Sequence, residues 1–136
     1  MEPGMQMHVR LGASDTHYPG DLIPASTLLR LMSDCGSALM LKEDGVSGLL
    51  AKWNGADFHA PVRVGEFVRI DCDYIRKGNR SRDIRCQVWR TIELIPGHDG
   101  PDNRRYLDTP ELIAEGVFVG VLHTVSGSPG PSADTR

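Results

Sequence analysis

Residues 24–42 read PASTLLRLMSDCGSALMLK and form the one long helical pattern in the sequence, so the expected fold is built around them. Its apolar residues recur at spacings of four, three and four, which is the stripe of a helix lying on a core: Leu28, Met32, Cys35 and Leu39. Pro24 suits the first turn, Lys42 suits the dipole of the last turn, and Gly45 supplies the stop. The sequence therefore predicts a helix over residues 24–42.

Most of the remaining sequence alternates between apolar and polar residues, as strands do. The expected strands are residues 5–11, 48–58, 66–75, 82–94 and 114–125. Gly78-Asn79 stands between two long alternating runs and predicts a hairpin. Residues 97–110 are polar and predict an exposed loop. Residues 126–136 are too poor in apolar side chains to order themselves and predict a disordered tail.

One long helix against an antiparallel sheet of about five strands is an α+β architecture. A helix wrapped by a single curved sheet is the hotdog fold, which we expect over residues 1–125, ahead of the tail at 126–136. A sheet of this size leaves an open edge, and proteins commonly cover such an edge with a second copy. We therefore expect a homodimer or a higher homo-oligomer.

Composition excludes several classes of protein. The chain has 136 residues and a formal net charge of -3, which argues against a nucleic-acid binder. No apolar run approaches the length of a membrane span, and the first residues lack the features of a signal peptide. The three cysteines are widely spaced, so we expect buried, unpaired thiols in a cytoplasmic protein and neither a disulfide nor a metal site.

The first candidate for chemistry is the loop at residues 15–21, between the first strand and the helix. His17 and Tyr18 lie close to a helix N-terminus, where backbone N–H groups converge and can bind a carbonyl or an anion. The alternative is an ordinary turn in which Asp21 caps the helix and Tyr18 packs.

Two carboxylates also stand in unusual positions. Asp34 falls at the border of the apolar helical stripe, where a carboxylate either faces solvent or serves a site. Asp57 comes at the end of a strand, next to Phe58 and ahead of Pro61, where an acid suits a general base. The alternatives are a solvent-facing helix residue for Asp34 and a turn-capping residue for Asp57.

The fourth candidate is the basic hairpin at residues 77–82. Gly78 and Asn79 form its turn, and Arg80 and Arg82 suit bidentate contacts with phosphates. The alternative is an ordinary charged turn.

Taken together, these segments follow one pattern: HYPGDLI at residues 17–23, Asp34 followed by Gly36 in the helix, DFHAPVRVGEF at 57–67 and KGNRS at 77–81. The pattern resembles the hotdog-fold 3-aminoacyl-CoA ammonia lyases, namely the β-alanyl-CoA and 3-aminobutyryl-CoA ammonia lyases. It covers residues 5–92 in register and the last strand loosely. The Phe-x-x-Pro-Val-x-x-Gly segment is shared with hotdog thioesterases, whereas the His-Tyr-x-Gly loop is more particular to the lyases.

The resemblance implies elimination of ammonia from a 3-aminoacyl-CoA, or the reverse addition, without a metal or organic cofactor. It implies an acyl-CoA substrate whose pantetheine arm runs between two subunits. The implied catalytic residues are Asp34, Asp57 and His17. The implied substrate contacts are Tyr18, Asp21 and Ala25, and the implied CoA contacts are Gly78, Asn79, Arg80 and Arg82.

The chain departs from the lyase pattern where the acyl group is expected. It has Asp21 in place of Asn, Pro24 in place of Asp or Asn, Ala25 in place of Gly, and Asp57 in place of Glu. Pro24 has no N–H, so Ala25 is the better oxyanion donor. The shorter Asp57 withdraws its carboxylate by about one bond, which matters for proton transfer.

Two other functions fit the same residues. A hotdog acyl-CoA thioesterase would use Asp34 or Asp57 to activate water against the thioester. A non-catalytic acyl-CoA-binding protein would bind these ligands without turning them over. Release of free CoA separates the thioesterase from the lyase, and ligand protection without turnover identifies the binding protein.

Overall fold

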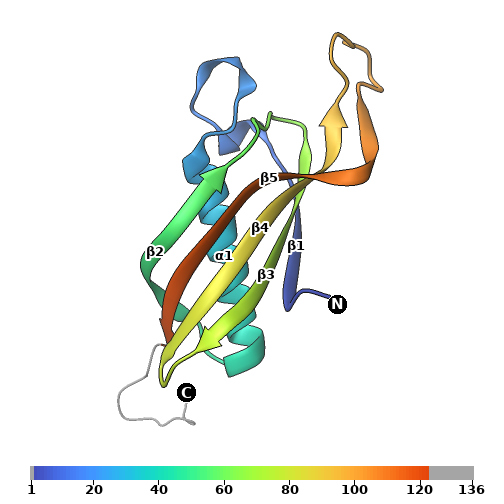
Figure 1. Ribbon diagram of the computed structural model, residues 1–136. Coiled ribbons are helices and arrows are strands. Elements are labelled where there is room, and N and C mark those ends of the chain that lie inside the picture. The colour runs from blue at the N-terminus through green and yellow to red at the C-terminus, as the bar shows by residue number, and fades with distance from the viewer. Residues whose placement is uncertain (1, 123–136) are drawn as a thin grey trace.

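The computed structural model describes residues 2–122 of the chain. Figure 1 shows one long helix lying across one face of a curved sheet. In chain order the elements are β1 (Met5–Arg10), two short 3-10 turns (Ala13–Asp15 and Pro19–Asp21), α1 (Ala25–Asp44), β2 (Gly48–Phe58), β3 (Phe67–Lys77), β4 (Ser81–Leu94) and β5 (Arg104–Leu122). The predicted tail at residues 126–136 and the predicted strand end at 123–125 lie outside the described residues.

The sheet has five strands in the order β1-β3-β4-β5-β2, and every pairing is antiparallel. Strands β1 and β2 are therefore the two edges. The α+β prediction of one helix wrapped by a curved five-stranded sheet is confirmed. The predicted hairpin at Gly78-Asn79 joins β3 to β4, as expected.

The core lies between α1 and the inner face of the sheet. The predicted helical stripe is buried, with exposures of 0 to 3%: Leu28, Met32, Cys35 and Leu39. Phe118 of β5 packs beneath the helix against Trp53 of β2, with ring centroids 4.7 Å apart. Gly36 faces the Phe118 ring, and a Cβ at this position would overlap the ring. The absence of a side chain at Gly36 therefore lets the helix lie close against the Phe118 ring of the sheet.

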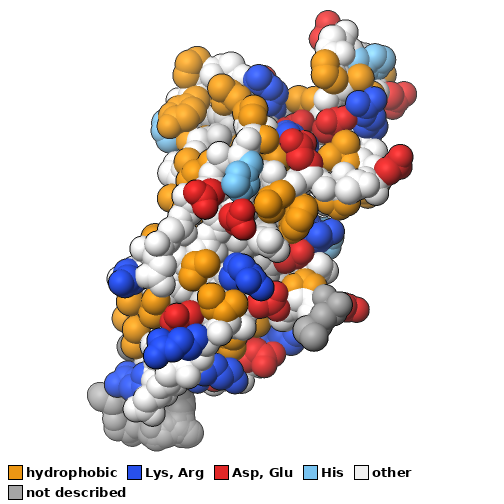
Figure 2. Space-filling view, in the orientation of Figure 1, with side chains coloured by type: hydrophobic (Ala, Val, Ile, Leu, Met, Phe, Trp, Pro, Cys, Tyr) orange, Lys and Arg blue, Asp and Glu red, His pale blue; other side chains and the backbone are white. Residues whose placement is uncertain are grey.

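The outer face of the sheet, away from α1, carries charged side chains of both signs interspersed with hydrophobic ones (Figure 2). Side chains alternate between the two faces along each strand. On β5, Gly116 faces Met32 of the helix, so Glu115 and Val117 belong to the outer face. No helix among the described residues is long and apolar enough to cross a membrane.

The predicted loop at residues 97–110 is wrong in its second half, because β5 already begins at Arg104. The connecting loop closes with a hydrogen bond from Ile95 N to Asn103 O at 2.7 Å. The ends of β4 and β5 thus form an arm that extends beyond the body of the sheet (Figure 1). Both faces of the arm lie outside the core, so its strands lack the apolar alternation that marks a half-buried strand.

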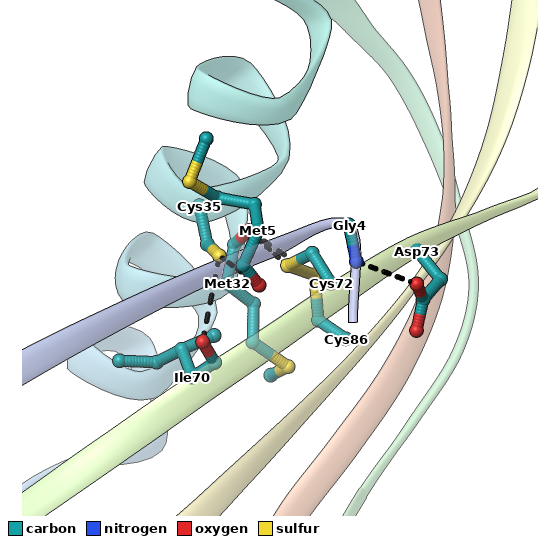
Figure 3. The surroundings of a disulfide bond; sticks show 8 residues. All are labelled: Gly4, Met5, Met32, Cys35, Ile70, Cys72, Asp73 and Cys86. Atoms are coloured by element: carbon teal, nitrogen blue, oxygen red, sulfur yellow. Dashed lines mark hydrogen bonds between the residues drawn. A yellow bond between two sulfur atoms is a disulfide. The ribbon is translucent and has the colours of Figure 1, made fainter. Parts of the chain in front are cut away.

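The cysteines also differ from the prediction, because Cys72 and Cys86 form a disulfide (Figure 3). These residues are direct partners on β3 and β4, with Cα atoms 4.3 Å apart. Strand register brings them together, and sequence spacing does not reveal register. Cys35 is a buried free thiol whose Sγ lies near the carbonyl oxygens of Met5 and Ile70, and burial raises its pKa to about 12.

Candidate functional site

The loop before α1 docks on the segment that follows β2. Leu22 forms an isolated antiparallel bridge with Arg63. Ile23 N donates to Val62 O at 2.9 Å, and Val64 N donates to Asp21 O at 2.9 Å. These bonds place the start of the helix and the 17–21 loop beside the end of β2. Two segments that are far apart in sequence, at 22 and 63, therefore build one corner of the molecule.

The 17–21 loop turns through two residues with left-handed backbone angles, Gly20 at φ 79° and Asp21 at φ 63°. Aspartate tolerates this conformation better than most residues with a side chain. Tyr18 is half exposed and makes an edge contact with the ring of His17 at 4.9 Å. The N-cap position is Pro24, so the alternative in which Asp21 caps the helix is wrong.

A cavity of about 310 Å³ opens at the start of the helix. It is lined by Ala25 and Leu28 of α1, Phe58 of β2, Ile23 and residues 59–62. The first N–H groups of an α-helix have no partner inside the helix and carry partial positive charge. Ala25 is the first residue of α1, so its N–H is suited to bind a carbonyl oxygen in this cavity.

Asp57 lies one residue before the end of β2, on the outer face of the sheet. Its partner in register on β5 is Glu115. Both carboxylates line a second cavity, of about 370 Å³, together with Asn54 and Arg85. Asp57 therefore lines a different cavity from Ala25, and its catalytic role stays a prediction.

Asp34 lies on the solvent-facing side of α1, with 51% of its side chain exposed. Arg30, one turn earlier, pairs with Asp34 at 3.3 Å and with Asp15 at 3.2 Å. Nine residues of helix separate Asp34 from Ala25, which is about 13 Å along the axis. Within one chain, Asp34 lines none of the cavities described above. Its role as a catalytic residue stays a prediction.

The basic hairpin lies at the opposite end of α1, where the helix ends at Asp44. Arg82 donates to both carboxylate oxygens of Asp44, at 3.1 and 2.9 Å, and to the carbonyl oxygens of Gly78 and Ser81. Arg80 donates to Leu122 O at 3.0 Å. Contact with CoA phosphates by Gly78, Asn79, Arg80 and Arg82 stays a prediction, and Arg82 already fastens the hairpin to the helix.

The Arg82–Asp44 pair is part of a partly buried polar cluster. The Tyr74 hydroxyl also donates to Asp44, at 2.6 Å. The hydrogen bond from Arg82 holds the pKa of the Asp44 carboxyl below its ordinary value of 3.8. Burial and the bond to Asp44 raise the pKa of the Tyr74 hydroxyl. The cluster therefore keeps Asp44 ionised and Tyr74 neutral at ordinary pH.

A second polar cluster, not foreseen from the sequence, supports the segment that lines the helix-start cavity. Arg90 is 9% exposed and donates to Glu66 at 2.7 Å, to Pro61 O at 2.9 Å and to Glu111 at 2.9 Å. The sequence does indicate this cluster, because Arg90 falls on the same face of β4 as the buried alternate residues from Ile84 to Val88. An arginine on the apolar parity of a strand indicates a buried ion pair.

His59 and Glu115 form a further pair that sequence reasoning missed. His59 Nε2 lies 2.9 Å from Glu115 Oε2, and His59 N donates to Ile113 O at 2.7 Å. His59 directly follows β2, so its contact with β5 depends on strand order rather than sequence. Among residues 2–122, no group of three or more His, Cys, Asp or Glu residues is arranged to hold a metal ion.

No protein-family model matches the chain. It is 29% identical over 108 residues to a 3-aminobutyryl-CoA ammonia lyase of Acetoanaerobium sticklandii, covering 79% of this chain and 84% of that protein. It is 31% identical over 117 residues to an uncharacterized acyl-CoA thioester hydrolase of Buchnera aphidicola, covering 85% of this chain and 78% of that protein. The chain belongs to the hotdog-fold family of acyl-CoA ammonia lyases and thioester hydrolases.

Solved structures share the fold of this chain. The β-alanyl-CoA:ammonia lyase of Clostridium propionicum superposes with a TM-score of 0.80 at 24% identity, covering 90% of this chain and 87% of that one. A hexameric thioesterase of Yersinia pestis superposes with a TM-score of 0.73 at 19% identity, covering 95% and 94%. The resemblance predicted from the sequence and the hotdog fold are thus confirmed.

Proposed function

We propose that this protein is a carbon–nitrogen lyase that eliminates ammonia from a 3-aminoacyl-CoA, or adds it to the α,β-unsaturated thioester. The observation that carries this proposal is the identity to a 3-aminobutyryl-CoA ammonia lyase across 79% of the chain. The TM-score of 0.80 to a β-alanyl-CoA:ammonia lyase supports it. The cavity at the start of α1 is the place where the acyl group fits.

The thioester carbonyl oxygen binds at the N–H of Ala25. Removal of the Cα proton places negative charge on this oxygen, and a fixed N–H donor at a helix N-terminus stabilises that charge. The apolar lining from Leu28, Phe58 and residues 60–62 accommodates the acyl chain. Tyr18 and Asp21 lie on the neighbouring loop and contact the β-substituent.

Asp34, Asp57 and His17 are the proposed acid–base and ammonium-binding residues. In one chain Asp34 and Asp57 lie on different elements and line no common cavity among those described. The proposal therefore requires a second subunit that completes the site. Homodimerisation through the open edge of β2 is part of the proposal, and the hexameric thioesterases with this fold support assembly into oligomers.

The proposed CoA site also lies between two subunits. Helix α1 has 20 residues, so the hairpin at its C-terminal end lies about 30 Å from the helix-start cavity. We propose that the pantetheine arm runs along the subunit interface and that Gly78, Asn79, Arg80 and Arg82 bind the phosphates. The reaction uses no metal or organic cofactor in this proposal. A cytoplasmic location remains proposed, although the disulfide removes the support that unpaired cysteines gave it.

A hotdog acyl-CoA thioesterase is the second candidate. It is favoured by the 31% identity to an acyl-CoA thioester hydrolase. In this case the reaction is hydrolysis of the thioester instead of elimination of ammonia. A carboxylate activates water, which attacks the thioester carbonyl held by Ala25. Free CoA is then a product, whereas the lyase leaves the thioester intact.

The test is to incubate the purified protein with 3-aminobutyryl-CoA and with β-alanyl-CoA. We expect ammonia and the unsaturated thioester in equal amounts, and no free thiol. Ammonia is measured with a coupled dehydrogenase, the thioester by chromatography, and free CoA with a thiol reagent. Free CoA without ammonia would establish the thioesterase instead, and binding without either product would refute both.

A backbone variant tests the position of the carbonyl. Ala25→Pro removes the N–H, and proline is well tolerated at the first position of a helix. Pro24 already has extended angles, φ -72° and ψ 156°, which a following proline accepts. We expect kcat to fall by about 100-fold or more with the fold intact. Ala25→Ser keeps the N–H and is the matched control, with activity close to that of the unaltered protein.

A further inference from the structure

Among the described residues that line the helix-start cavity, one has a titratable side chain, and it is neither Asp34 nor Asp57. His59 is one of the residues that line the cavity, and the other described residues that line it have apolar side chains. Within one chain, His59 is therefore the titratable residue nearest to hand for a proton moved in this cavity. A general base must lie within hydrogen-bonding reach of the proton it takes.

The contact with Glu115 favours one tautomer of the His59 imidazole. The distance from His59 Nε2 to Glu115 Oε2 is 2.9 Å. An ionised carboxylate only accepts hydrogen bonds, so the neutral ring carries its proton on Nε2. Nδ1 is then the nitrogen with a free lone pair. The second contact, from His59 N to Ile113 O, fixes the backbone of the residue to β5.

Glu115 in turn is positioned by the sheet. It lies on β5 directly opposite Asp57 of β2, so two carboxylates and the imidazole gather at one end of two paired strands. Histidine and acidic side chains lie side by side on this outer sheet face (Figure 2). This arrangement of a base oriented by an acid is the one that acid–base catalysts use.

We propose that His59 is the catalytic acid–base group of this chain and that Glu115 positions it. The proposal rests on the lyase function proposed above and names the group that moves the proton in that reaction. His17 was the histidine expected from the sequence, whereas the structure places His59 at the cavity. Asp34 and Asp57 are then left to hold the substrate ammonium.

The proposed step balances with one imidazole. His59 Nδ1 takes the Cα proton, and the C–H electrons form an enolate on the thioester oxygen beside Ala25. The enolate electrons then form the Cα=Cβ bond, and the Cβ–N bond breaks with loss of ammonia from the substrate ammonium. The imidazolium returns its proton to the departing ammonia, which leaves as ammonium. His59 ends the cycle neutral, and no oxidant or further reactant is consumed.

The test uses His59→Ala in the full-length protein, assayed with 3-aminobutyryl-CoA. We expect kcat to fall by about 100-fold with KM nearly unchanged, and added imidazole to restore part of the rate in a saturable manner. His59 is substantially exposed, so the variant is expected to fold, and its thermal unfolding is measured alongside. His8→Ala, on the opposite edge strand, is the matched control and keeps the unaltered rate.

Glu115→Gln tests the positioning role. We expect kcat to fall by about 10-fold, with no change in KM or in thermal unfolding, because the amide keeps the shape but loses the charge. A purely structural contact would instead lower stability and leave kcat intact.

The outcomes separate the two proposals. If the unaltered protein forms no ammonia from 3-aminoacyl-CoA esters, the proposed function fails and this inference fails with it. If the unaltered protein is active and His59→Ala keeps its kcat, only the assignment of His59 is overturned. A folded His59→Ala protein with reduced kcat that imidazole does not restore would also overturn it.

Discussion

Arg80 and Arg82 are the same residue type on one hairpin but have different surroundings in the structure. The sequence offers Arg80 and Arg82 as equivalent cations on one hairpin. In the structure Arg82 is 8% exposed and is bound on every side, by Asp44 and by two carbonyl oxygens. The main role of a buried guanidinium that has a full set of hydrogen-bond acceptors is to stabilise the fold.

Replacing Arg82 should therefore destabilise the protein. Arg82→Met leaves Asp44 partly buried without its cationic partner, and the side chains of the pair are only 10% and 15% exposed. We expect the free energy of unfolding to fall by about 3 kcal/mol, measured by urea titration. Arg85→Met, on the exposed face of the same strand, is the control and should change stability little. Equal effects of the two variants would contradict the assignment.

The same pair gives a pH dependence with a defined sign. The pKa of Asp44 is lower in the folded protein than its ordinary value of 3.8, so folding favours the ionised form. The resulting stabilisation is fully present above pH 3.8 and is lost as the pH falls through the folded pKa. Asp44→Asn should remove this part of the acid destabilisation, which urea titrations at a series of pH values would show.

At the scale of elements, the close approach of α1 and the sheet depends on Gly36. A glycine within a helix costs stability relative to alanine, so its presence needs a packing reason. The reason is the ring of Phe118, which occupies the space a Cβ would take. Phe118 is 3% exposed and packs against Trp53, so the ring has little freedom to move.

Gly36→Ala should destabilise the protein by about 1 to 2 kcal/mol, because overpacking outweighs the better helix propensity of alanine. The change is measured by urea unfolding, followed through tryptophan fluorescence. Ser37→Ala is the neighbouring control, and we expect it to leave stability nearly unchanged. If Gly36→Ala stabilised the protein, the gain in helix propensity would outweigh the overpacking at this position, which would contradict the prediction.

For the whole molecule, the open edge of β2 is the feature that a single chain leaves incomplete. It is eleven residues long and pairs with β5 on one side alone among the described strands. Leu49 and Leu50 of β2 are 66% and 46% exposed. Long edge strands with exposed apolar side chains are places where another chain adds to a sheet.

We expect Leu50→Lys to convert the proposed dimer to a monomer, because it places a positive charge on the apolar edge of β2. Sedimentation equilibrium gives the mass, and the same protein should lose lyase activity if the partner completes the site. Ile75→Lys is the matched control, since Ile75 is also 46% exposed but lies on β3. An unaltered protein that is already monomeric, or a Leu50→Lys dimer, would contradict the proposed interface.

The helix, the strongly alternating strands, the α+β class and the family could all be predicted from the sequence. These features depend on local periodicity and turn residues, which single-sequence patterns carry directly. The loop before the helix and the segment after β2 do contact each other, whereas the roles of Ala25 and Asp57 stay predictions. The strand at 104–110 was missed because an exposed arm has no buried face to create alternation.

Which side chains come into contact depends on how the helix and strands pack. Strand register paired Cys72 with Cys86, and strand order brought His59 to Glu115 across β2 and β5. Helical geometry turned Asp34 to solvent beside Arg30. Such contacts arise between residues far apart in the chain, and their geometry follows from how elements pack. No local pattern of residue types encodes it.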